Sequence, residues 1–99
     1  IKAYQLDVRY KPYEAKAHSN LGAAYMKLSK LEDAVRELQT AVKYDPTDHI
    51  AHFNLGLIHA NERNFEEAMN ELQLAIKHRP DFAEAKRVLE NIQRAYRGS

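Results

Sequence analysis

The chain has 99 residues, of which 29 % are charged and 44 % hydrophobic, a composition typical of a folded soluble domain. A net charge of +1 leaves no basic stripe for nucleic acid, and no apolar run approaches the roughly 20 residues that span a bilayer. We therefore expect neither a nucleic-acid nor a membrane partner. The absence of cysteine excludes disulfides and thiol catalysis but identifies no compartment. The localisation is therefore unknown, and a soluble domain slightly favours the cytoplasm.

Residues 1–12 form the first predicted element, because their apolar residues follow helical spacing up to Pro12, which cannot donate an amide. Shifted by 34 residues, the segment aligns with residues 35–46. We interpret it as the second helix of a partial repeat whose first helix is missing. A helix without its partner exposes apolar side chains, so we expect a homo-oligomer formed through this helix. The residues expected in this self-association are Ile1, Tyr4 and Leu6.

Residues 15–48 are repeated as residues 49–82, with 13 identical pairs among 34 aligned positions. In each copy the apolar periodicity predicts two helices with a two-residue connection. Gly22 and Gly56 stand inside the first helix of each copy, where glycine costs about 1 kcal/mol against alanine, so they indicate close helix approach. The predicted helices are 14–28, 31–44, 49–62 and 65–78. The apolar stripe of the first of these comprises Ala17, Leu21, Ala24, Tyr25 and Leu28.

Residues 82–97 begin like a third copy but carry Glu90 at the glycine position. Their apolar residues form a single stripe, and polar residues cover the other sides, as a helix that ends a repeat array requires. We therefore predict one domain over residues 1–99. Its parts are the partial repeat 1–12, repeat one at 15–48, repeat two at 49–82 and a capping helix at 83–97.

The 34-residue period and the order Leu21-Gly22, Tyr25, Ala34, Ala41 and Pro46 resemble the tetratricopeptide repeat (TPR) pattern over nearly the whole chain. The resemblance implies an all-α fold, a right-handed TPR superhelix (α-α solenoid) of antiparallel helix hairpins. It also implies a non-catalytic scaffold that binds a peptide segment of a protein partner in a concave groove. The alternative is a structural spacer or self-association module within a larger protein.

In this family the first helices of the repeats line the groove, and Asn20 and Asn54 recur at one groove position. An amide offers both a donor and an acceptor, so a ladder of asparagines can hold a peptide backbone whatever its side chains. The alternative interpretation is that both are merely solvated polar residues. The groove positions that the resemblance implies include Ser19, Asn20, Ala23, Lys27, Phe53, Asn54, Leu57, Asn61, Arg87 and Asn91.

The residues at these groove positions indicate the chemistry of the ligand. Basic residues outnumber acidic ones among them, and Phe53 and Leu57 supply apolar contacts. We expect a short segment with a hydrophobic anchor and some acidic character, although charges scattered by chance would look similar. The charged groove residues are Lys16, Lys27, Arg87 and Arg94 against Glu84.

Three other site classes are not expected. The carboxylate clamp for chaperone tails, known in some family members, requires charges that Ser19, Ala23 and Asn91 do not supply. His18 and His52 recur where the family often has a large aromatic residue, and no cysteine or carboxylate completes a tetrahedral metal set, so no metal is expected. The sequence has no glycine-rich phosphate loop and no nucleophile elbow. We therefore expect no cofactor and no enzyme.

Overall fold

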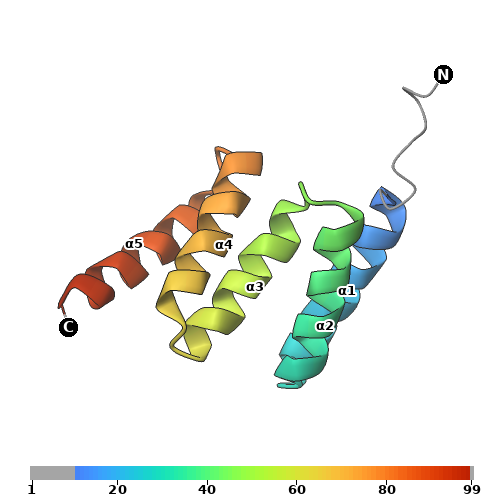
Figure 1. Ribbon diagram of the computed structural model, residues 1–99, viewed down its shortest axis with the longest axis horizontal. Helices are drawn as coiled ribbons and strands as arrows, with labels where there is room; N and C mark the ends of the chain where they lie inside the picture. Colours follow the sequence, from blue (N-terminus) through green and yellow to red (C-terminus); the bar gives the residue numbers. More distant parts are fainter. Residues whose placement is uncertain (1–10, 99) are drawn as a thin grey trace. The chain divides into compact units, whose positions relative to one another are not determined.

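The computed structural model describes residues 11–98, which form five α-helices and no strand, so the predicted all-α class is confirmed. The chain divides into two compact units. The first unit contains α1 (Pro12–Lys27) and α2 (Leu31–Tyr44), and the second contains α3 (His49–Asn61), α4 (Phe65–His78) and α5 (Ala83–Gly98) (Figure 1). Residues 1–10 of the predicted N-terminal element, with the self-association residues Ile1, Tyr4 and Leu6, lie outside the described residues. Pro12, which was predicted to end that element, is instead the first residue of α1.

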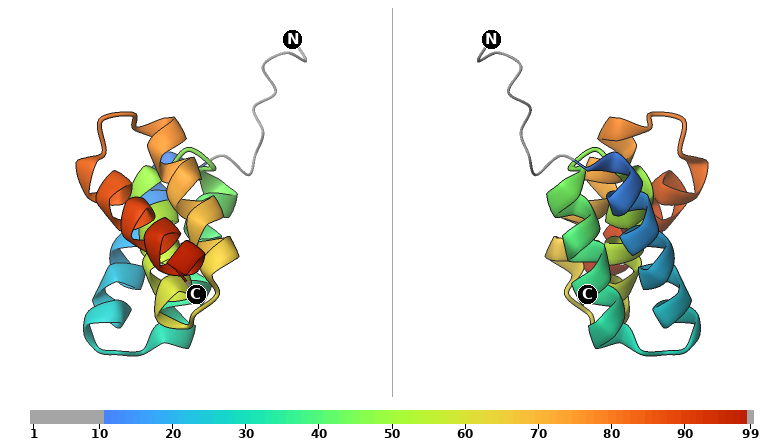
Figure 2. Two further views of the ribbon diagram at one scale, coloured as in Figure 1. Left: turned by 90° about the vertical axis from the view of Figure 1, so that its left-hand side faces the viewer. Right: turned by 90° about the vertical axis from the view of Figure 1, so that its right-hand side faces the viewer.

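The two helices of each hairpin pack against each other through a glycine on the first helix and a leucine on the second. α1 lies antiparallel to α2, and α3 lies antiparallel to α4 (Figures 1 and 2). A Cβ at Gly22 would lie 2.7 Å from Leu38 Cγ, and one at Gly56 would lie 2.9 Å from Leu72 Cγ. Both leucines are fully buried. The predicted close approach is therefore confirmed, because only glycine admits a leucine at these positions.

Both hairpins also turn in the same way. The Lys30 amide donates to Tyr25 O at 2.9 Å, and the Asn64 amide donates to His59 O at 2.8 Å. Ser29 and Arg63, which precede these donors, adopt positive φ of 62° and 65°. This is the Schellman arrangement, which satisfies the last carbonyls of a helix and is normally made with glycine.

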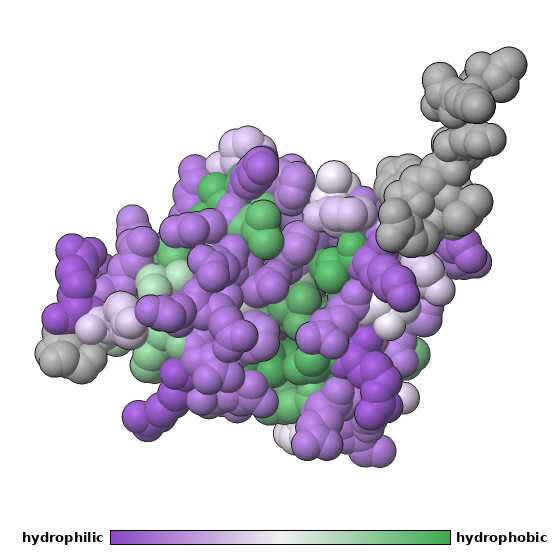
Figure 3. All heavy atoms as spheres, viewed as in Figure 1, coloured by the Kyte–Doolittle hydropathy of each residue, from purple (hydrophilic) through white to green (hydrophobic). Residues whose placement is uncertain are grey.

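In the second unit the apolar side of α5 packs against α4. Ala85 and Ile92 of α5 belong to one buried cluster with Ala68, Leu72 and Ala75 of α4. Most of the surface seen over α5 in Figure 3 is hydrophilic. α5 therefore has one buried stripe on an otherwise polar helix, and the role of residues 83–97 as a cap stays a prediction.

Tyr96 extends this contact to the beginning of α4. Its ring lies 6.2 Å from that of Phe65, and its hydroxyl donates to Glu66 Oε2 at 3.2 Å. The hydrogen bond raises the pKa of Tyr96 above its ordinary value, and the charge of Glu66 and some burial add to this.

The side of α1 that is buried differs from its predicted apolar stripe. Of that stripe, only Tyr25 is partly buried. Leu21 is 42 % exposed and Leu28 is 64 % exposed. The buried residues are instead Ala15, Ser19 and Gly22, which share the side of α1 that faces Leu38. Periodicity in the sequence reveals an apolar stripe, but it does not show which side of the helix another helix covers.

We expect Gly56→Ala and Gly22→Ala each to lower the free energy of unfolding. The added methyl group would overlap Leu72 or Leu38, an overpacking that costs about 1–3 kcal/mol, and a gain of about 1 kcal/mol in helix propensity only partly offsets it. Urea denaturation measures the net change. As a control, adding Leu72→Ala to Gly56→Ala should cost less than the two single changes together. An increase in stability for either glycine variant would contradict the contact.

Arg63→Gly should raise the free energy of unfolding by about 1 kcal/mol, because glycine carries no penalty at positive φ whereas a residue with a Cβ does. Ser29→Gly should have a similar effect in the first hairpin. Thermal unfolding followed by circular dichroism tests both. The matched control is Glu62→Gly, one residue earlier in the same connection, which has no positive φ and should not stabilise.

Candidate functional site

On α1 three predicted groove residues form one side of the helix. Asn20, Ala23 and Lys27 follow i, i+3, i+7 spacing, which places them on a common face. Asn20 and Lys27 are exposed, and Ala23 is half-buried. Within residues 11–98 the side-chain amide of Asn20 makes no hydrogen bond. This amide is therefore open to a ligand.

Ser19 has a different environment from the other predicted groove residues of α1. It is 3 % exposed, and its hydroxyl is buried without a hydrogen-bond partner among the described residues. It shares the buried side of α1 with Ala15 and Gly22. Ser19 therefore offers no surface to a peptide in this structure, and we do not count it among the contacts proposed below.

On α3 the equivalent face is formed by Asn54, Leu57 and Asn61. Asn54 and Leu57 are half-buried, and Asn61 is exposed. No hydrogen bond to the side-chain amide of Asn54 is present among the described residues. Each hairpin thus presents an asparagine at the same register, with its amide groups uncommitted.

Phe53, predicted to supply an apolar contact to the ligand, packs within the second unit. Its ring centroid lies 4.8 Å from that of Phe82, whose ring also contacts His49 at 5.6 Å and the Arg79 guanidinium at 5.2 Å. Phe53 is half-buried, so only part of its ring remains accessible. The position equivalent to Phe53 in the first hairpin is Ser19, so both hairpins use this position for packing.

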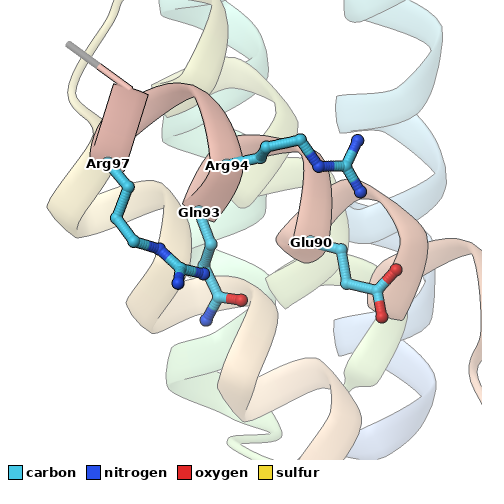
Figure 4. A pocket seen from close by; sticks show the side chains of 4 residues that line it. All are labelled: Glu90, Gln93, Arg94 and Arg97. Carbon is cyan, nitrogen blue, oxygen red and sulfur yellow. The ribbon is translucent and has the colours of Figure 1, made fainter.

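The polar side of α5 contributes Arg87 and Asn91, both exposed. A shallow depression on the same helix is lined by Glu90, Gln93, Arg94 and Arg97, and the side chains of Gln93 and Arg97 extend toward one another (Figure 4). All four residues come from one helix and face solvent. Such a surface can attract an acidic segment electrostatically, but it cannot exclude water from a reaction.

Each hairpin contains a histidine–glutamate contact between its two helices. His18 Nδ1 lies 2.6 Å from Glu37 Oε1, and His52 Nδ1 lies 2.7 Å from Glu71 Oε1. The sequence analysis assigned the histidines to packing and did not find their partners. The sequence did contain a sign of this contact, because Glu37 and Glu71 are identical residues of the two aligned copies.

The family model of the tetratricopeptide repeat matches residues 19–84, more than half of the chain. The chain belongs to the tetratricopeptide repeat family. No match was found among curated proteins. TPR domains generally mediate protein–protein interactions, and the family is generally composed of non-catalytic scaffolds. The exposed amides and basic residues described above are consistent with a protein partner for this TPR domain.

Two further observations concern other classes of site. Residues 11–98 contain no group of three or more histidine, cysteine, aspartate or glutamate side chains arranged to hold a metal ion. Among the helices that the structure describes, none is both long and apolar enough to cross a membrane.

Glu71→Ala should lower the free energy of unfolding by about 1–3 kcal/mol, because it deprives a buried imidazole of its acceptor at Nδ1. Glu37→Ala should cost less, since the side chain of His18 is 34 % exposed whereas that of His52 is 8 % exposed. Chemical denaturation of the two variants gives this comparison within one TPR domain. Equal effects would show that burial of the histidine does not determine the strength of the contact.

Proposed function

We propose that this TPR domain is a non-catalytic module that binds a peptide segment of a protein partner through the faces of α1 and α3 that carry Asn20 and Asn54. The observation that carries the proposal is the repetition of an asparagine whose amide makes no hydrogen bond within residues 11–98. A buried structural role would commit these donors and acceptors to neighbouring groups. Uncommitted amides at one register suit the alternating N–H and C=O groups of an extended peptide.

The neighbouring side chains define the ligand we propose. Lys16 and Lys27 flank Asn20 on α1 and are exposed, and Arg87 is exposed on α5. Leu57 adds apolar surface beside Asn54. A segment with acidic residues and one hydrophobic anchor complements these groups. Because the basic residues are exposed, they should affect the association rate and salt dependence more than the affinity.

Asn20→Ala and Asn54→Ala test the proposal. A library of displayed ten-residue peptides is selected against the wild-type chain, and the affinity of the best peptide is measured for each variant by fluorescence anisotropy. Each lost hydrogen bond is worth about 0.5–1.5 kcal/mol, so we expect a weakening of about 2- to 10-fold for each variant, without loss of stability.

Gln39→Ala and Gln73→Ala provide the matched control. These glutamines are also identical in the two copies and exposed, but they lie on α2 and α4. The proposal requires that their loss leaves peptide affinity unchanged. If the glutamine variants weaken binding and the asparagine variants do not, the binding surface lies on the second helices and the proposal is wrong.

A further inference from the structure

The side of α5 opposite α4 carries most of the charges of that helix. Ala85, Leu89 and Ile92 belong to the cluster with α4 or pack against it. Because each residue turns an α-helix by about 100°, the charged residues lie on the other side. All of them are exposed, and Gln93 among them is half-buried. We name this side the basic face, and its residues are Lys86, Arg87, Glu90, Gln93, Arg94 and Arg97.

The basic face holds charges that the described part of the chain does not neutralise. Four basic side chains and one acidic side chain give it a formal charge of +3, whereas the whole chain carries +1. Within residues 11–98 no ion pair or hydrogen bond involves these side chains. They are therefore available to a ligand of opposite charge.

Glu90 excludes the kind of helix packing that each hairpin uses. It occupies the repeat position of Gly22 and Gly56. At both glycines a Cβ alone would already overlap the facing leucine. A helix that covered α5 in the same way would also bury charges without partners, which is unfavourable. The ligand that suits the basic face is therefore a charged segment and not an apolar helix.

The charges of the basic face have a definite order along α5. Lys86 precedes Glu90 by four residues, and Arg94 follows it by four, so the carboxylate lies between two cations, each about 6 Å away along the helix axis. Arg97 adds a further cation beyond Arg94. In Figure 4, Glu90 and Arg97 lie at opposite ends of the depression that they line with Gln93 and Arg94. A complementary ligand carries two acidic groups with a basic group between them.

We propose that the basic face binds a segment of a partner protein in which acidic residues flank a basic one. In an extended chain every second side chain points to the same side, with a separation of about 6.6 Å. This separation is close to the spacing of the charges on α5. Alternate residues of an extended segment can therefore pair with Lys86, Glu90 and Arg94 in turn. The surface lies on α5 and does not depend on peptide binding through Asn20 and Asn54.

Two other polyanions complement the basic face less well. A nucleic acid presents a continuous row of phosphates, and Glu90 would repel the phosphate that faces it. A helix that lies in a membrane surface inserts its apolar side between the lipids. The apolar side of α5 is instead packed against α4. An acidic protein segment is favoured because it can place a basic residue opposite Glu90.

The experiment is a titration of the full chain, followed by NMR, with two acetylated and amidated heptapeptides. The first probe is Glu-Ser-Lys-Ser-Glu-Ser-Glu, and the second has glutamate in place of its lysine. We expect the amide shifts caused by the first probe to lie on α5. Arg94→Gln combined with Arg97→Gln should weaken its binding about threefold or more, since two exposed ion pairs are lost. The experiment leaves Arg87 unchanged, because that residue also belongs to the proposed function.

Glu90→Gln tests the order of the charges. It removes the carboxylate that faces the central residue of the probe. Binding of the lysine probe should become weaker and binding of the all-glutamate probe stronger. The ratio of the two affinities should change by about two- to fivefold, the size expected for an exposed ion pair. An unchanged ratio would overturn the proposal, because the surface would then attract any anion regardless of its charge order.

Lys43→Gln combined with Lys77→Gln is the matched control, because it removes two positive charges from exposed residues of α2 and α4. It should leave both affinities unchanged. Equal weakening by the lysine pair and the arginine pair would show that net charge alone attracts the probe, and the proposal would be wrong.

The remaining outcomes separate this proposal from the other surfaces and ligands. Weaker binding of the first probe in Asn20→Ala or Asn54→Ala would place it on α1 or α3 and would overturn the proposal. If the asparagines prove unimportant for the selected peptides, the results expected on α5 stay the same. Tighter binding of an oligothymidylate of the same net charge would identify nucleic acid as the ligand and would also overturn the proposal.

Discussion

The contact between a glycine on one helix and a leucine on the next determines the structure of each hairpin. Gly22 and Leu38 form it in the first unit, and Gly56 and Leu72 form it in the second. Because the leucine side chain occupies the space of a missing Cβ, the helix backbones approach closely. This approach fixes the rotation of the first helix about its axis, and that rotation decides which residues face inward. The polar and apolar faces described above follow from this one constraint.

The rotation gives α1 three sides with different chemistry. Ser19 and Gly22 face α2, Asn20 lies on the polar side, and Leu21 lies on the exposed apolar stripe. Consecutive residues reach different sides because each residue turns an α-helix by about 100°. The side of α1 that packs in its hairpin is therefore different from the side that presents the amide of Asn20.

The two hairpins share their contacts but differ in their aromatic residues. The histidine–glutamate contact and the turn at positive φ occur in both. In the second unit, however, Phe53 packs on Phe82, whereas the equivalent position in the first unit carries the buried Ser19. The equivalent positions are therefore packed in different ways in the two units. The hydroxyl of Ser19, which has no hydrogen-bond partner within residues 11–98, is a polar group in an environment that an apolar side chain would suit better.

The amino-acid sequence alone determined the period, the helices of the described residues, the all-α class and the close helix approach at Gly22 and Gly56. These depend on local spacing and on the comparison of two copies. Only the tertiary structure decided that Ser19 is buried, that Phe53 packs on Phe82 and that His52 meets Glu71. The sequence also could not decide that the stripe with Leu21 remains exposed. Each of these depends on which surfaces meet, and a helical pattern specifies a face without specifying its partner.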